Sequence, residues 1–155
     1  MVKALFTLLM PFLILKCSTN DCEEMICFTP PQAFQFEIID VNSSQNLYTL
    51  GLLFKKDLKI YETKTGISRE FSFINENDLN IITVNSIGWK NEKVELTIEL
   101  KKNLNFTLYV DAQRKNENCC SFKTMNEIII QPFEYKPDQS KELYQIYIPY
   151  SSLII

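Results

Sequence analysis

Val94-Glu95-Leu96-Thr97-Ile98-Glu99-Leu100, joined by Lys101-Lys102-Asn103 to Leu104-Asn105-Phe106-Thr107-Leu108-Tyr109-Val110, is the stretch that decides the fold. Apolar and polar residues alternate in both segments, which is the period of a strand with one buried face. The three polar residues between the segments are enough for a hairpin loop. The stretch therefore predicts a β-hairpin that lays one apolar face on a core.

Shorter segments of the same kind occur on both sides of this hairpin. We expect strands at 34–39, 57–61, 71–73, 79–84, 128–130 and 143–149, with a polar loop at 111–118 and irregular chain at 132–137. The gaps are too short for the helices that connect parallel strands. The pattern predicts one all-β domain over residues 25–155, an antiparallel β-sandwich of seven to eight strands, immunoglobulin-like or transthyretin-like.

The amino-acid composition argues against several classes of function. The chain has 155 residues, 46% of them hydrophobic, and a net charge of −3. Arg69 and Arg114 are its only arginines, so it lacks the basic surface of a nucleic-acid binder. There is no histidine, which removes the commonest general base and metal ligand. We therefore expect a protein that is not an enzyme and carries no cofactor and no metal.

The N-terminus has the layout of an export signal. Lys3 precedes a run of 12 apolar residues at 4–15, and polar residues follow. A membrane span needs about 20 apolar residues, so the run suits a signal peptide better than a transmembrane helix. We expect residues 1–16 to be the signal peptide; the alternative is a buried N-terminal helix or strand.

Cys17 stands at the end of this signal. Leu13-Ile14-Leu15-Lys16-Cys17 resembles a bacterial lipobox, whose cysteine takes diacylglycerol and becomes the first residue of the mature chain. Lys16 departs from the pattern, which has Gly, Ala or Ser there. The resemblance implies lipid attachment at Cys17, with 17–24 as anchor and acidic tether. The alternative is a secreted protein without lipid on Cys17.

The other four cysteines are Cys22, Cys27, Cys119 and Cys120, an even number that indicates disulfides in an exported chain. Of the three possible pairings, we favour the two that link Cys22 and Cys27 to Cys119 and Cys120. A loop of about 90 residues closed in this way is worth about 4 kcal/mol in the chain-entropy model. A Cys119–Cys120 bond and a four-thiolate zinc site are the less favoured alternatives.

Three side chains outside the cysteines invite a functional interpretation. Trp89 could serve as a sugar-stacking platform, although a tryptophan of this kind is more often part of the core, and we expect that here. Glu95 and Glu99 lie on one strand face and could act as an acid–base pair. We expect them instead to be solvated.

The mature chain resembles small lipoproteins of Bacteroidota, particularly flavobacteria, that have no assigned function. The residues that carry this resemblance are Cys17, Cys27-Phe28-Thr29-Pro30-Pro31, Phe36-Glu37-Ile38-Ile39-Asp40, Asn46-Leu47-Tyr48-Thr49 and Cys119-Cys120. The resemblance implies a cell-envelope location and no reaction.

Together these features predict an outer-membrane lipoprotein, on its periplasmic or surface side, that acts as a non-catalytic accessory or binding module. Its partner would be an envelope protein or a glycan. The alternatives are a soluble secreted binding domain and a carboxylate-based envelope hydrolase.

Overall fold

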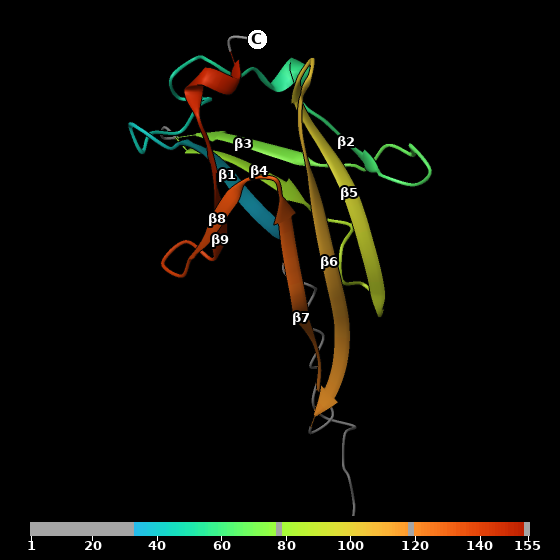
Figure 1. The fold of residues 1–155 in the computed structure, drawn as a ribbon. Coiled ribbons are helices and arrows are strands. Elements are labelled where there is room, and N and C mark those ends of the chain that lie inside the picture. Colours follow the sequence, from blue (N-terminus) through green and yellow to red (C-terminus); the bar gives the residue numbers. More distant parts are fainter. Residues whose placement is uncertain (1–32, 77–78, 118–119, 154–155) are drawn as a thin grey trace, which may run out of the picture.

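The structure, a computed structural model, describes residues 33–76, 79–117 and 120–153 and forms a β-sandwich (Figure 1). The five-stranded sheet has the order β3 (Ser72–Glu76), β4 (Leu79–Val84), β1 (Phe34–Asp40), β9 (Leu143–Ile148) and β8 (Glu134–Asp138). The four-stranded sheet has the order β2 (Lys59–Glu62), β5 (Glu92–Lys101), β6 (Leu104–Glu117) and β7 (Cys120–Gln131). Two short 3-10 helices, η1 (Lys55–Asp57) and η2 (Tyr150–Leu153), complete the described chain. The prediction of an antiparallel all-β sandwich is confirmed.

The hairpin that opened the sequence analysis is β5–β6. Leu96 pairs with Leu108 and Ile98 pairs with Phe106, and all four side chains are buried. Their face packs on the inner face of β1, where Phe36 meets Phe106 edge-on at 6.0 Å between ring centroids. The alternating pattern thus places the hairpin on one side of a core that lies between the sheets.

One strand pair is parallel. β1 and β9 run side by side in the same direction, with Phe36 opposite Tyr144 and Asp40 opposite Ile148. Because these strands come from opposite ends of the described chain, no short connection has to join them. The other strand pairs of the two sheets are antiparallel.

Two expectations of irregular chain were wrong. The predicted loop at 111–118 contains the second half of β6, which runs to Glu117 and pairs with β7 along its length. β5 stops pairing with β6 at Glu92 and Ala112, so the β6–β7 arm extends beyond the rest of the sandwich (Figure 1). The hydrogen bonds that pair the strands of this arm come from backbone groups. A polar side chain on the arm does not enter the core, so it has no desolvation cost there.

The segment at 132–137 holds β8, which brings the number of strands described to nine. β8 is an edge strand and contains Pro137. A proline lacks the N–H that an interior strand needs, but an edge strand tolerates it. Because of this proline, the sequence pattern predicted irregular chain here and not a strand.

The described residues contain no helix of the length and hydrophobicity required to cross a membrane.

Candidate functional site

One wall of the candidate site is the connection from the four-stranded to the five-stranded sheet. After β2 the chain turns at Gly66 and pairs back on its own strand, with Glu62 N donating to Ile67 O at 2.9 Å and Arg69 N donating to Ile60 O at 2.8 Å. Residues 70 and 71 then pass to β3 in the other sheet. The backbone pairing on β2 fixes the position from which Arg69 projects.

The opposite wall is the return connection, from β4 to β5. Gly88 turns the chain at a φ of +88°, and its N–H donates to Glu92 Oε1 at 2.7 Å. The indole Nε1–H of Trp89 donates to Asn85 O at 3.0 Å, which closes a small loop. Asn85 Nδ2 donates to Ser72 Oγ at 3.0 Å, so a side-chain hydrogen bond ties the two walls together.

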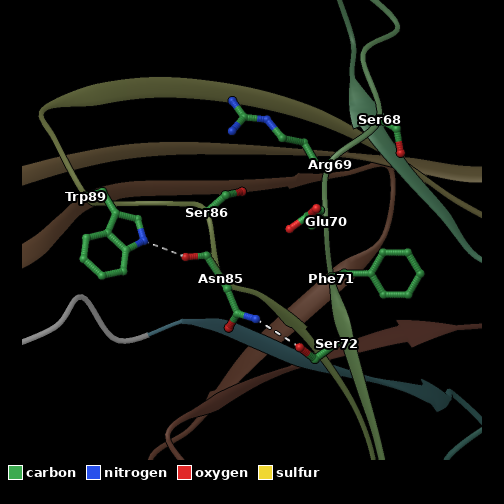
Figure 2. Close-up of a pocket in the computed structure, with 8 residues that line it drawn as sticks. All are labelled: Ser68, Arg69, Glu70, Phe71, Ser72, Asn85, Ser86 and Trp89. Atoms are coloured by element: carbon green, nitrogen blue, oxygen red, sulfur yellow. Dashed lines mark hydrogen bonds between the residues drawn. The ribbon is translucent and has the colours of Figure 1, made fainter.

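A groove of about 610 Å³ lies between the two walls, and we call it the Trp89 groove (Figure 2). This volume is within the range of about 300–1,000 Å³ that small-molecule sites occupy. Phe71 is among the lining residues, but its ring points away from Trp89 in Figure 2 and packs against the core. The side chains that characterise the groove are Arg69, Glu70, Ser72, Asn85, Ser86 and Trp89.

Trp89 is not part of the core, and the expectation that it would be is wrong. Its side chain is 53% exposed. It follows β4 and precedes β5, in a connection between the two sheets. Since the indole N–H is bonded to Asn85, the exposed part of the ring is apolar carbon held in one orientation.

Two polar atoms of the groove are buried without a hydrogen-bond partner among the described residues, Arg69 Nε and Ser86 Oγ. Arg69 Nη2 is engaged, in an ion pair of 2.6 Å with Glu62 Oε1. Figure 2 shows Arg69 reaching from its wall toward the segment that carries Ser86. A buried polar group without a partner costs about 1–3 kcal/mol, so both groups favour a ligand or solvent atom that satisfies them.

Few charged side chains line the groove. Glu70 is the one carboxylate and Arg69 the one cation among the described residues that line it. Glu62 is the carboxylate that pairs with Arg69. The pKa of the Glu62 carboxyl is lowered mainly by a hydrogen bond from the hydroxyl of Thr65 and further by Arg69. The groove therefore combines one flat aromatic surface, hydroxyl and amide groups, and little net charge.

A second hollow, of about 420 Å³, lies where β7 faces the start of β1 and β9 and includes Lys123, Met125 and Tyr144. Burial lowers the pKa of Lys123 to about 8, although the Glu92 carboxylate opposes the shift. Its alkyl chain passes over Gly88 and leaves no room there for a Cβ. The side chain of Lys123 therefore packs against Gly88, in the same connection that carries Trp89.

A polar network lies on the outer face of the five-stranded sheet, around the buried carboxylate of Glu37. Glu37 Oε1 accepts from Gln145 Nε2 at 2.9 Å and lies 3.4 Å from Lys141 Nζ, and Glu37 Oε2 accepts from Asn46 Nδ2 at 3.5 Å. Asn46 Nδ2 also donates to Asn80 O at 3.1 Å. Because each donor comes from a different element, the network joins β1, β4 and β9, and we interpret it as structural.

The site residues predicted from the sequence are mostly untested. Cys17, Cys22, Cys27 and Cys119 lie outside the described residues. Cys120 begins β7 and is half-buried. The pairing of the cysteines and the lipid on Cys17 therefore stay predictions.

Glu95 and Glu99, which we expected to be solvated, lie on the face of β5 that is opposite the core. Both side chains are half-buried on β5, and Glu99 accepts a hydrogen bond from Lys59 Nζ at 2.8 Å. In the part of the chain that is described, no group of histidine, cysteine and carboxylate side chains is arranged to hold a metal ion.

Sequence reasoning missed Arg69, Asn85 and Ser86. They come from two connections that are distant in sequence and meet only because β3 pairs with β4. The available signal was Gly88-Trp89, a glycine turn beside a large aromatic residue between two predicted strands, which is a position outside the sheets.

Comparisons with protein-family models, with curated proteins and with solved structures found no match to the chain.

Proposed function

We propose that this protein is an exported, lipid-anchored envelope protein that binds a partner without catalysis, and that the Trp89 groove is its binding site. The observation that carries the proposal is the exposure of Trp89, 53% of whose surface is open while its N–H is fixed on Asn85 O. A rigid exposed aromatic side chain above polar groups is the usual composition of a binding surface.

The export part of the proposal rests on the N-terminal sequence. The apolar run at 4–15 supports a signal peptide, and the lipobox-like residues that end at Cys17 support lipidation. Such an anchor would hold the sandwich at the membrane, with residues 17–24 as its tether. The proposed location is the outer membrane, on its periplasmic or surface side.

The disulfides belong to the same proposal, since they form and persist in an oxidising compartment. We propose that Cys22 and Cys27 are linked to Cys119 and Cys120, and Cys120 is the first residue of β7 in the β6–β7 arm.

The groove favours binding over hydrolysis. Glycoside hydrolysis uses two carboxyl groups on either side of the scissile bond. Among the described residues that line the Trp89 groove, Glu70 is the one carboxylate, and it is exposed. The hydrolase alternative would therefore need a second acid from elsewhere.

Metabolic labelling with a fatty acid tests the anchor. Labelled acyl chains should appear on the wild-type protein and be absent from Cys17→Ser, while both proteins are exported. An exported wild-type protein that takes no label would be a soluble secreted domain, which is the alternative form of the proposal.

A sedimentation assay tests the groove. The purified full chain, kept in detergent, is mixed with delipidated envelope fragments and centrifuged. Wild type should sediment with the fragments, and Trp89→Ala should stay in solution. Phe54→Ala is the matched control, because Phe54 is also 53% exposed but does not line the groove. Equal sedimentation of wild type and Trp89→Ala would show that the site lies elsewhere.

A further inference from the structure

We infer that the ligand of the Trp89 groove is a neutral saccharide, recognised by stacking on the indole and by hydrogen bonds to its hydroxyl groups. This inference rests on the proposed function, since it names the ligand class for the same site. It comes from three properties of the groove: the charge, the kind of polar groups and the nature of the exposed aromatic surface.

The charge of the groove disfavours an ionic ligand. Arg69 is already paired with Glu62 at 2.6 Å, and Glu70 adds a second carboxylate. An anionic ligand would meet two carboxylates and one arginine, with the arginine already neutralised. A cationic ligand would find Glu70 as its unpaired carboxylate in the groove, and this side chain is exposed, so solvent screens its attraction. A ligand without charge depends on neither interaction.

The polar groups of the groove suit hydroxyls. Ser68, Ser72 and Ser86 supply hydroxyls that donate and accept, and Asn85 supplies an amide. Two buried groups still require partners: Arg69 Nε–H needs an acceptor, and Ser86 Oγ can donate or accept. A sugar hydroxyl both donates and accepts, so neighbouring hydroxyls of one ring can serve groups of both kinds.

The aromatic surface suits the C–H face of a pyranose ring. The N–H of Trp89 is held by Asn85 O, so the ring offers its ligand apolar carbon and no further hydrogen bond. A pyranose with equatorial substituents has one such flat face, with hydroxyls around its edge. Stacking on Trp89 would bury that face while the hydroxyls reach Ser86 and Arg69 on the walls (Figure 2).

A peptide fits these properties less well. Peptide recognition places apolar side chains in pockets or adds a strand to a sheet edge. Phe71 also lines the groove, but its ring points away from Trp89 (Figure 2) and packs against core residues. The groove retains Trp89 as its exposed aromatic surface among the described residues that line it.

Titration of the intrinsic fluorescence tests the inference, because Trp89 is the single tryptophan of the chain and reports on this groove alone. The full chain is titrated with neutral oligosaccharides of glucose, xylose, mannose and N-acetylglucosamine, up to millimolar concentration. Oligogalacturonate and a mixture of short peptides serve as charged and peptide probes. We expect a saturable blue shift with at least one neutral oligosaccharide and none with the other two.

Calorimetry with the sugar that shifts the fluorescence then tests its contacts with Trp89 and Ser86. Trp89→Ala and Ser86→Ala should each weaken binding by about tenfold or more, while Phe54→Ala leaves the affinity unchanged. Ser86→Ala removes one hydroxyl from a half-buried side chain, so it keeps the test valid even where Trp89→Ala fails to fold. Unchanged affinity in Ser86→Ala would contradict the proposed contact with the walls.

The outcomes separate this inference from the proposed function. A response to the peptides or to oligogalacturonate, with none to the neutral sugars, overturns the saccharide and leaves the groove as the binding site. No response to any probe also overturns the saccharide, and the sedimentation of Trp89→Ala then decides whether the groove binds at all.

Discussion

The indole Nε1–H of Trp89 donates to the backbone oxygen of Asn85 at 3.0 Å, and this bond holds the tryptophan outside the core. The same asparagine reaches Ser72 on the opposite connection. One residue therefore fixes the orientation of the aromatic ring and the spacing of the two walls. The fold supplies a pre-organised groove, and pre-organisation lowers the entropic cost of binding.

The turn that carries Trp89 should be sensitive to a Cβ at Gly88. Gly88→Ala would force alanine into a φ of +88° and against the side chain of Lys123, so we expect a loss of about 2 kcal/mol or more in the free energy of unfolding. Gly66→Ala is the control, because Gly66 has a φ of +69° and open space around its Cβ position. It should lose about 1 kcal/mol. Urea unfolding measures both, and equal losses would argue against the contact with Lys123.

Tyr48→Phe should leave the protein as stable as wild type or more stable. The hydroxyl of Tyr48 is buried and has no hydrogen-bond partner among the described residues, and its burial raises the pKa of the phenol. Removal of an unsatisfied hydroxyl keeps the ring contact with Phe73 and lifts a desolvation cost. Tyr135→Phe is the matched comparison, since Tyr135 OH donates to Ile128 O at 2.6 Å. It should lower the free energy of unfolding by about 1 kcal/mol in urea titrations.

Lys123 should make the stability of the protein rise with pH. Its pKa is lowered from 10.5 to about 8 by burial, so between these values the folded protein has released a proton that the unfolded chain still holds. The unfolded state binds more protons in this range, and the free energy of unfolding therefore increases with pH. The difference between wild type and Lys123→Met, followed by urea unfolding as pH rises from 8 toward 10.5, isolates this effect. A difference that stays flat with pH would contradict the burial of the ammonium group.

Glu37 should stabilise the five-stranded sheet by accepting hydrogen bonds from side chains on other segments. Glu37→Ala would leave Gln145 Nε2 and Asn46 Nδ2 without this acceptor, and we expect a loss of about 2–3 kcal/mol. Glu37→Gln keeps a carbonyl oxygen for one donor and should lose less. Thermal unfolding ranks the variants, and a Glu37→Gln protein less stable than Glu37→Ala would contradict the hydrogen-bond account.

Peptide mapping tests the proposed disulfides. Under non-reducing conditions, with free thiols blocked during extraction, peptides that contain Cys22 and Cys27 should be linked to the peptide with Cys119 and Cys120. A bond confined to Cys119 and Cys120, or bound zinc at four thiolates, would refute this pairing.

The sandwich was predictable where strands bury one face. Residues 94–110 alternate because every second side chain enters the core, and the structure places Leu96, Ile98, Phe106 and Leu108 there. The outer half of the β6–β7 arm was not predictable in this way. It pairs through backbone groups beyond the end of β5, so no core selects its side chains.

The candidate site was less predictable than the fold. A tryptophan has the same apolar character in a core as on a surface, so residue type alone could not place Trp89 outside. Arg69 and Ser86 come together because two connections between the sheets lie side by side, which depends on strand order. Strand order is set by long-range pairing and is not visible in a local pattern.

The central claim is that the Trp89 groove binds the ligand, and the indole N–H signal of the protein in a ¹⁵N–¹H NMR spectrum tests it most directly. The chain has one tryptophan, so there is one such signal, from the N–H bonded to Asn85 O. Soluble oligosaccharides released from the envelope should shift this signal until it saturates. If the ligand binds, as judged by shifts of backbone signals elsewhere, while the indole signal stays in place, the site lies outside the groove and the account is wrong.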